Sequence, residues 1–405
     1  MRPLPVPLVF ASVVAVLGGA CGASRAGPPP GPRAAATVAE PPAPDVADRS
    51  PRLDSDPSTY SACAAPSVLK LHAPDDTRDS AVATCAPGDG WARVADREQG
   101  ASVRCDAAGR PGLLVHVMSA ALPLDPATRG HVRDVFRAGR AAGRRADAFG
   151  LVGDSMTVEA NFMRPFAAAR TLPPAVASAL SLASGPAGVR TVVDLFRAAR
   201  VDDLSMTADS FLAPRAAKVG VRATWPLAPR GAKQQSPLDE MVDAVSPAYA
   251  VVLYGANDAL WRTDLPRLEA DFGAALTAIV DALESRGIVP ILTTIPKHMR
   301  EAGWPDCPYV AASGSNERFA AQASALSADV AALACRRHLP LIDLRWALDP
   351  LLDHGVGPDG VHLSVHPSGG AVLDATGLQC GYNVRNLATL RELALVVDAA
   401  AAGVW

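Results

Sequence analysis

Residues 148–158 read AFGLVGDSMTV, an apolar run that ends in Gly-Asp-Ser and is followed by more apolar residues. The apolar run has the length of a buried strand, and the polar turn has two interpretations. Asp154 and Ser155 could cap the helix that follows, since Asp and Ser are favoured N-cap residues. Alternatively, Ser155 is a nucleophile at the end of a strand. The tripeptide alone leaves both interpretations open.

Further apolar runs of strand length lie at 248–255, 288–296 and 339–346. A segment at 264–287 separates the first two and carries apolar residues at helical spacing, with Gly287 as the expected C-cap. Continuous apolar strands alternating with amphipathic helices favour a parallel sheet covered by helices on both faces. In such folds the functional groups gather at the carboxyl ends of the strands. The Gly-Asp-Ser turn lies at such an end.

Three short motifs supply different chemical groups at predicted strand-end loops. GDSM contains Ser155, GAND contains Asn257, and DGVH contains Asp359 and His362. A serine hydroxyl becomes a good nucleophile when a histidine removes its proton and a carboxylate orients that histidine. The Asn257 amide can donate to the oxyanion of a tetrahedral intermediate. Each motif alone is more often a turn or cap, but together they predict a serine hydrolase site.

In this order the three motifs resemble blocks I, III and V of the SGNH (GDSL-type) hydrolases, over roughly residues 145–401. The resemblance implies a three-layer α/β/α sandwich with a parallel, flavodoxin-like sheet, and hydrolysis of acyl esters without a metal or organic cofactor. It also implies that Ser155 is the nucleophile, His362 the base and Asp359 its orienting acid. Asn257 and the backbone N–H of Ser155 would be oxyanion donors.

Block II of that family places an oxyanion glycine after the second strand, and no clear strand pattern precedes a glycine here. Gly220 is the best candidate, with Gly185 and Gly188 behind it. The chain also differs from the nucleophile elbow of α/β-hydrolases, because Thr157 occupies the position of the last glycine in G-x-S-x-G.

The N-terminal third of the chain indicates export. We expect a signal peptide at 1–20, a flexible Pro/Ala-rich tether at 21–60, a small β-rich accessory segment at 61–125 and the hydrolase domain at 126–405. LGGAC at 17–21 resembles the lipobox of bacterial lipoproteins, in which Cys21 would carry the lipid. A lipidated Cys21 would attach the chain to a membrane surface without spanning it. Plain secretion is the alternative.

The other six of the seven cysteines could pair in an oxidising compartment, or two of them could remain buried thiols. No spacing resembles a CxxC metal site, and Pro367 after His366 weakens a helical HxxxH site, so we expect no metal. The net charge of −3 and the absence of basic runs exclude a nucleic-acid partner.

Several other residues have two interpretations. Trp261 and Trp304 could line a substrate cleft, pack in the core or form a hydrophobic rim. Arg385 and Asn386, on a predicted terminal helix at 381–400, could reach the site or serve a structural role. His298, His338 and His354 are expected to be ordinary surface or loop residues, and Asp258 to bond within its own loop.

The sequence therefore predicts an exported serine esterase, lipid-anchored or secreted, that acts on small acyl esters or acylated glycans. Two alternatives use the same fold. A non-catalytic surface binding protein would keep the fold without turnover, and an acyltransferase would pass the acyl group to a sugar hydroxyl instead of water. The substrate's acyl length, the oligomeric state and the role of residues 61–125 do not follow from the sequence.

Overall fold

The structure is a computed structural model that describes residues 84–85, 91–93, 102–104, 114, 117–118, 120–183, 185–198, 209–298, 315–357 and 359–400. The predicted signal peptide, the tether, Cys21 and Trp304 lie outside the described residues. None of the helices in the described ranges is long and apolar enough to cross a bilayer.

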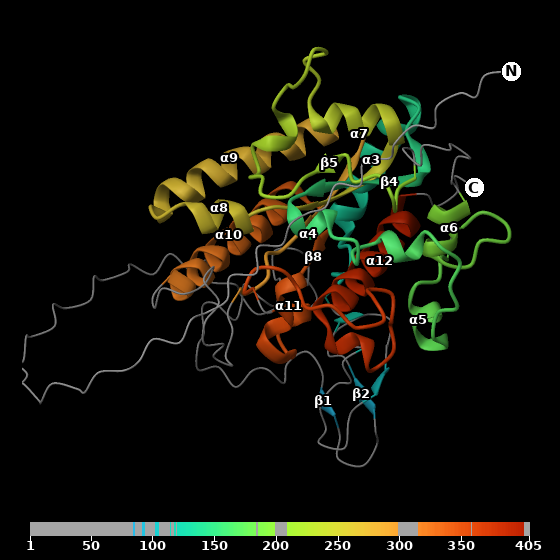
Figure 1. The fold of residues 1–405 in the computed structure, drawn as a ribbon. Helices are drawn as coiled ribbons and strands as arrows, with labels where there is room; N and C mark the ends of the chain where they lie inside the picture. Colours follow the sequence, from blue (N-terminus) through green and yellow to red (C-terminus); the bar gives the residue numbers. More distant parts are fainter. Residues whose placement is uncertain are drawn as a thin grey trace, which may run out of the picture. The chain divides into compact units, whose positions relative to one another are not determined.

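The centre of the fold is a parallel sheet that runs through the middle of the ribbon (Figure 1). Its five strands have the order β5-β4-β6-β7-β8. Its strands are β4 (Arg145–Gly153), β5 (Ala216–Ala217), β6 (Pro247–Leu253), β7 (Val289–Thr293) and β8 (Leu341–Ile342). Every residue of β6 and β7 is buried, as expected for strands covered on both faces. The predicted parallel sheet is confirmed.

The last predicted strand, 339–346, is wrong in its length. Only Leu341–Ile342 pairs with β7, and the helix α11 (Leu344–Leu348) begins directly afterwards. Asp343 causes this change, because its buried carboxylate accepts a hydrogen bond from the Trp346 amide and caps the helix. An N-cap residue inside an apolar run therefore ends the strand early.

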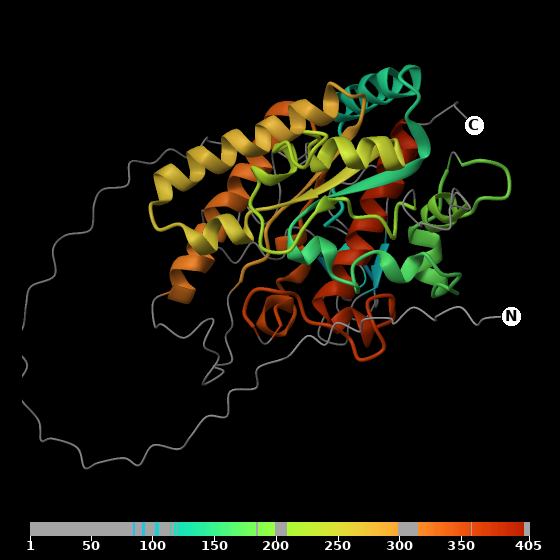
Figure 2. The same ribbon diagram turned by 45° about the horizontal axis from the view of Figure 1, so that its top comes forward.

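Helices cover both faces of the sheet, which gives three layers (Figure 2). On one face, Phe149 of β4 packs edge-on against Phe196 of α6 (Val192–Ala198), and Tyr249 of β6 stacks on Phe136 of α3 (Pro126–Ala141). The terminal helix α12 (Gly381–Ala400) contacts α3 and α6 and completes this layer.

The opposite face carries α7 (Pro237–Val245), α9 (Leu265–Glu284) and α10 (Ser315–Arg337). Gly150 of β4 points to this face, where an added Cβ would lie 2.4 Å from the Met241 sulfur of α7. Adjacent residues of β4 thus contact helices of opposite layers, as the alternation of a strand requires.

The helix predicted at 264–287 is α9, which Asp264 caps at its N-terminus by accepting from the Arg267 amide. Gly287 adopts a left-handed φ of +69° just beyond the helix, and its amide donates to Glu284 O. A Cβ at Gly287 would lie 2.3 Å from the Gly139 Cα in α3, so glycine also permits a close approach of the two backbones. Asp125 caps the N-terminus of α3 by accepting a hydrogen bond from the Thr128 amide.

Two shorter helices, α4 (Ser155–Val158) and α8 (Ala256–Trp261), follow β4 and β6, and α5 (Pro174–Ala179) precedes α6. A separate three-stranded antiparallel sheet lies within the 61–125 segment. Its strands are β1 (Thr84–Cys85), β2 (Trp91–Arg93) and β3 (Ser102–Arg104). Short 3-10 turns occupy Arg164–Phe166, Trp225–Leu227 and Gly377–Gln379, and Leu352–Gly355 forms a turn whose inner residues are left-handed.

Candidate active site

The candidate site lies where the strand order reverses. The chain passes from β4 to β5 on one side and then to β6 on the other side of β4. The carboxyl ends of β4 and β6 therefore border the crevice in which open α/β sheets bind ligands. Ser155 follows β4 and Asn257 follows β6, so the topology brings two of the three motifs to this point.

Ser155 is the first residue of the short helix α4 (Ser155–Val158), and Asp154 is its N-cap. The Asp154 carboxylate accepts from the Met156 amide at 3.1 Å, so the capping role belongs to Asp154 and leaves the Ser155 hydroxyl free for another partner. Gly153 is required by the tight turn, since a Cβ there would lie 2.2 Å from Thr157 Oγ1.

The DGVH motif forms a compact turn beside Ser155. Asp359 Oδ1 accepts from the amides of Val361 and His362, at 3.0 and 2.9 Å, and Asp359 Oδ2 lies 2.5 Å from His362 Nδ1. His362 Nε2 lies 2.8 Å from Ser155 Oγ. A carboxylate, an imidazole and a hydroxyl thus form one continuous chain of hydrogen bonds, with the spacing that a serine nucleophile and its base require.

The pKa shifts of Asp359 and His362 agree with these hydrogen bonds. Burial would raise the pKa of Asp359, but the hydrogen bonds from His362 and the two amides outweigh it and lower the pKa to about 2. The hydrogen bond to Asp359 raises the pKa of His362 against the opposing effect of burial. Asp359 is therefore a carboxylate at neutral pH, and it stabilises the imidazolium that forms when His362 accepts a proton.

Asn257 lies in the first turn of α8 (Ala256–Trp261), and its Nδ2 donates to Asp154 Oδ2 at 3.3 Å. The turn before it needs Gly255, whose φ is +121° and whose Cβ would lie 2.2 Å from Ile295 Cδ1. Since Asp154 precedes Ser155, this bond ties Asn257 to the turn that carries the proposed nucleophile. The sequence did not indicate the Asp154–Asn257 contact.

Gly220 lies three residues beyond β5, in an exposed left-handed position with a φ of +73°. Its loop returns to the nucleophile turn, because the Lys218 amide donates to Gly153 O at 3.2 Å. β5 is only two residues long, which explains why no strand pattern precedes Gly220 in the sequence. Gly185 and Gly188 lie in the loop before α6 and follow no strand of the sheet.

The buried Asp258 also holds this loop. Its carboxylate accepts from the Ala223 amide at 3.3 and 3.4 Å, so it bonds to the loop after β5 as well as to its own backbone. Burial raises the pKa of Asp258 to about 6.

Side chains of α12 hold the segment after Ser155 by hydrogen bonds. Arg385 donates to Met156 O at 2.6 Å and to Thr157 Oγ1 at 3.1 Å, and its guanidinium lies 3.6 Å above the Phe162 ring. Asn386 accepts from the Met163 amide and donates to Asn161 O and Gly370 O. Of the two interpretations of these residues, the structural one is therefore correct.

Three histidines were expected on the surface or in loops. His298 and His354 do lie in a loop and a turn, but both are buried and not on the surface. His298 is 2% exposed and stacks on Phe319, and His354 is 7% exposed. His366 accepts from the Ser368 amide, and no group of three or more metal-ligating side chains occurs among the described residues.

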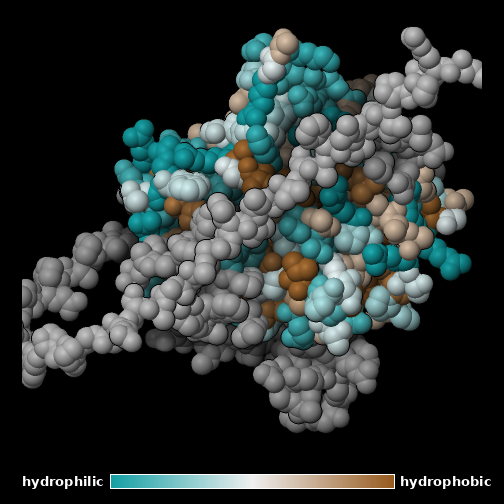
Figure 3. Space-filling model, in the orientation of Figure 1, coloured by the Kyte–Doolittle hydropathy of each residue, from teal (hydrophilic) through white to brown (hydrophobic). Residues whose placement is uncertain are grey.

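Large apolar side chains are exposed at three positions in the described part of the chain: Val219, Trp261 and Val365. The interpretation that Trp261 packs in the core is therefore wrong, since 64% of this residue is exposed. Val219 precedes Gly220, Trp261 lies one helical turn beyond Asn257, and Val365 lies three residues beyond His362. On the face shown in Figure 3, hydrophobic atoms form small separate groups among hydrophilic ones.

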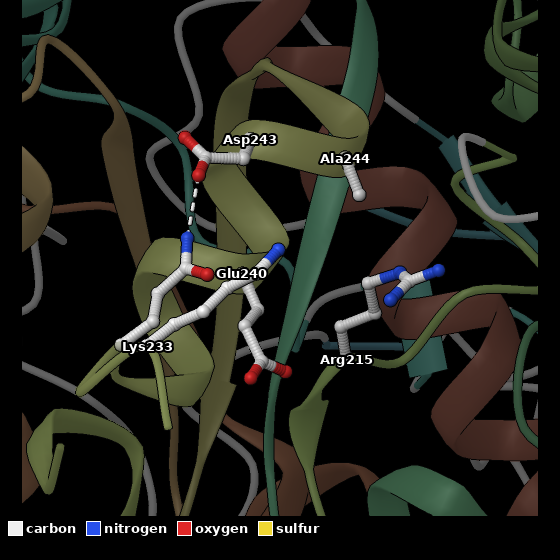
Figure 4. A pocket seen from close by; sticks show the side chains of 6 residues that line it. Arg215, Lys233, Glu240, Asp243 and Ala244 are labelled. Carbon is white, nitrogen blue, oxygen red and sulfur yellow. Dashed lines mark hydrogen bonds between the residues drawn. The ribbon is translucent and has the colours of Figure 1, made fainter. Parts of the chain in front are cut away.

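A surface pocket of about 440 Å³ lies beside α7 and contains none of the motif residues. Figure 4 shows its charged lining, with cationic Arg215 and Lys233 near anionic Glu240 and Asp243. Gln235 donates to Asp243 across this pocket.

The cysteines do not all pair. Cys380 is a free, half-buried thiol, whereas Cys335 of α10 is disulfide-bonded.

Comparison with known protein families gives one match. The model of the GDSL-like lipase/acylhydrolase family matches residues 151–369, more than half of the chain, and includes all three motifs. No curated protein matches the chain.

Proposed function

Because the chain belongs to the GDSL-like lipase/acylhydrolase family and is a serine hydrolase that acts on esters, we propose that Ser155, His362 and Asp359 are its catalytic triad. The observation that carries this proposal is the unbroken chain of contacts from Asp359 Oδ2 through the His362 ring to Ser155 Oγ, at 2.5 and 2.8 Å. The three side chains come from two loops that are separated by about 200 residues.

In the first half of the cycle, His362 Nε2 takes the proton of Ser155 Oγ as the oxygen attacks the ester carbonyl. The carbonyl oxygen becomes an oxyanion. Its proposed donors are the Ser155 amide, the Asn257 side chain and the Gly220 amide. His362 then gives its proton to the leaving alcohol, and the acyl group stays on Ser155.

In the second half, His362 removes a proton from water as the water attacks the acyl-enzyme. Collapse of the second tetrahedral intermediate releases the acid and returns the proton from His362 to Ser155 Oγ. Asp359 keeps the proton of the neutral imidazole on Nδ1 throughout, so that Nε2 is free to accept. The chain's own side chains supply the acid, the base and the first nucleophile of this cycle, and water is the second nucleophile.

The proposed substrates are acyl esters, including acetyl esters, of small molecules or of glycans. The side chains of His362 and Asp359 are 40% and 44% exposed, which suits a substrate approaching from solvent. Val219 directly precedes the proposed oxyanion residue Gly220, and Trp261 and Val365 follow Asn257 and His362 in sequence. All three offer apolar surface to the groups flanking the ester.

We also propose that the protein is exported and attached to the bacterial cell envelope through a lipid on Cys21. The support is the apolar stretch of 1–20, the LGGAC sequence and the Pro/Ala-rich segment at 21–60.

A fluorophosphonate probe tests the proposed nucleophile. The purified protein should be labelled on Ser155, and Ser155→Ala should lose the label and lower kcat on a panel of p-nitrophenyl esters by roughly 10⁴-fold or more. His362→Ala should also abolish labelling. Ser285→Ala is the matched control, because its exposed hydroxyl bonds only to Ala282 O at the end of α9.

Labelling of Ser155→Ala, or turnover that survives it, would contradict the assignment. Circular dichroism and thermal unfolding of each variant establish that the loss is chemical and not a loss of fold.

A further inference from the structure

A left-handed turn lies directly before the loop that carries His362. Asp353 and His354 have φ/ψ of +50°/+31° and +51°/+38°, and Gly355 continues the turn with a φ of +69°. Residues other than glycine rarely adopt this conformation, and consecutive ones need surrounding contacts that enforce it. Strained backbone of this kind is frequent at functional sites, where surrounding contacts hold it in place.

The turn is joined to His362 by backbone hydrogen bonds. The Gly357 amide donates to His362 O at 2.7 Å, and the Ser364 amide donates to Gly355 O at 2.8 Å. Val356 and Leu363 form an antiparallel bridge between these two bonds. The position of the His362 backbone therefore depends on where the left-handed turn places residues 355–357.

The side chain of His354 fixes the turn from both sides. Its Nε2 lies 3.0 Å from Lys297 Nζ, and its Nδ1 lies 3.2 Å from Asp349 O. An ammonium group has no acceptor, so Nε2 must accept from Lys297, and the ring proton then lies on Nδ1 and is donated to Asp349 O. His354 is 7% exposed, so water does not readily replace these contacts.

The backbone at Lys297 is held close to the central sheet. It lies four residues beyond the buried strand β7, and its neighbour His298 stacks on Phe319 of α10 with ring centroids 4.6 Å apart. The contact between Lys297 and His354 thus ties the left-handed turn to the end of a central strand.

We propose that Lys297 and His354 are positioning residues for the catalytic base, which hold the left-handed turn and through it keep His362 in reach of Ser155. This inference rests on the proposed triad and adds two residues that touch neither the substrate nor the triad side chains. Without the Lys297 contact the turn relaxes toward a right-handed or extended conformation, and His362 moves relative to Ser155.

The test compares Lys297→Met, which keeps the length of the side chain but removes the donor, with Lys297→Arg, which keeps a donor. Lys297→Met should lower kcat and the rate of fluorophosphonate labelling of Ser155 by roughly ten- to a hundredfold, since small misplacements of a catalytic group have effects of this size. KM should change little. Lys297→Arg should recover most of the rate, and Lys233→Met, an exposed lysine beside α7, should behave as wild type.

A second variant guards against simple loss of folding. His354→Asn removes the ring, but asparagine tolerates the left-handed region. It should lower the labelling rate as Lys297→Met does, and the double variant should be no slower than either single one, because both break the same contact. The proton on His362 Nδ1, followed by NMR, should shift or broaden in each variant relative to wild type.

Labelling of Lys297→Met at the wild-type rate, or full additivity in the double variant, would overturn the inference and leave the triad intact. A wild-type protein that is folded but is neither labelled nor active would contradict the proposed function itself, so the two failures are distinguishable.

Discussion

Asp154 places a fully buried carboxylate beside the proposed nucleophile. Burial raises its pKa to about 6, against the opposing effects of the Met156 amide, Arg385, His362 and Asn257. An unfolded aspartate has a pKa near 4, so the folded state binds the proton more tightly between these two values. Stability is therefore highest with Asp154 protonated and falls by about 3 kcal/mol as the pH rises from 4 through 6, at 1.36 kcal/mol per pKa unit.

We expect Asp154→Asn both to remove this pH dependence of stability and to lower esterase activity. Relative to wild type, the variant should gain about 3 kcal/mol of unfolding free energy between pH 4 and pH 7, because it has no carboxylate to desolvate. Its kcat at pH 7 should fall by up to about 10²-fold, since the Asn257 amide loses its carboxylate partner and an oxyanion donor is misplaced. Urea unfolding at pH 4, 5 and 7 with parallel esterase assays measures both quantities.

A stability difference between the two proteins that stays constant across this pH range would show that Asp154 does not titrate as proposed. Asp and Asn have nearly the same volume, so a packing defect contributes little to the difference in unfolding free energy.

At the scale of elements, the terminal helix α12 supports the helix that begins with Ser155. α12 is buried almost all round, and Arg385 reaches from it to the carbonyl of Met156 and the hydroxyl of Thr157. Burial lowers the pKa of this guanidinium to about 10, which leaves it charged at neutral pH, and its charge in turn lowers the pKa of Asp154. A helix from the end of the chain thus influences both the geometry and the charge of the nucleophile turn.

Arg385→Met should therefore destabilise the protein and also change its pH–activity profile. The buried Met156 carbonyl loses its partner, which costs roughly 1–3 kcal/mol of unfolding free energy. The pKa of Asp154 should rise above about 6, because a neighbouring positive charge is gone, so the pH at which activity is lost on acidification should move upward. Arg385→Lys keeps the charge without the two-pronged contact, and it should move the profile less than Arg385→Met while still lowering stability. Identical pH profiles for wild type and Arg385→Met would contradict the electrostatic link.

Elements with long apolar or periodic patterns could be predicted from the sequence, and short ones could not. β4, β6, β7 and the helices α9 and α12 follow from their patterns, because burial on two faces or one face dictates the residue types. β5 has two residues and leaves no pattern, and Asp343 ends β8 by capping α11. The reason is physical: a two-residue strand is determined by its neighbour β4 and not by its own composition.

At the scale of the whole molecule, the motif residues of the site were predictable because each motif combines a turn with a distinctive polar group. Their supporting contacts were not. Asn257 meets Asp154 across 103 residues and Lys297 meets His354 across 57, and neither pair carries a local signature. Such contacts depend on which strands are adjacent in the sheet, which is a property of the fold.

The proposed lipid anchor is also a property of the whole chain, because it would decide where the folded domain works. An acyl chain contributes about 0.8 kcal/mol for each CH₂ buried in a bilayer, whereas the described domain has no helix that spans one. Cys21→Ser should therefore move the full-length protein from the membrane fraction to the soluble fraction and leave its specific esterase activity unchanged.

Cys380→Ser is the matched control, because Cys380 is a free thiol on the folded domain and its loss should leave the protein with the membranes. Detergent phase partitioning and the mass of the N-terminal peptide measure the outcome directly. An N-terminal peptide that begins at Cys21 and carries acyl chains would support the anchor. A wild-type protein that is soluble, with an unmodified N-terminus beyond residue 20, would instead favour plain secretion, in which case the segment to residue 60 serves no tethering role.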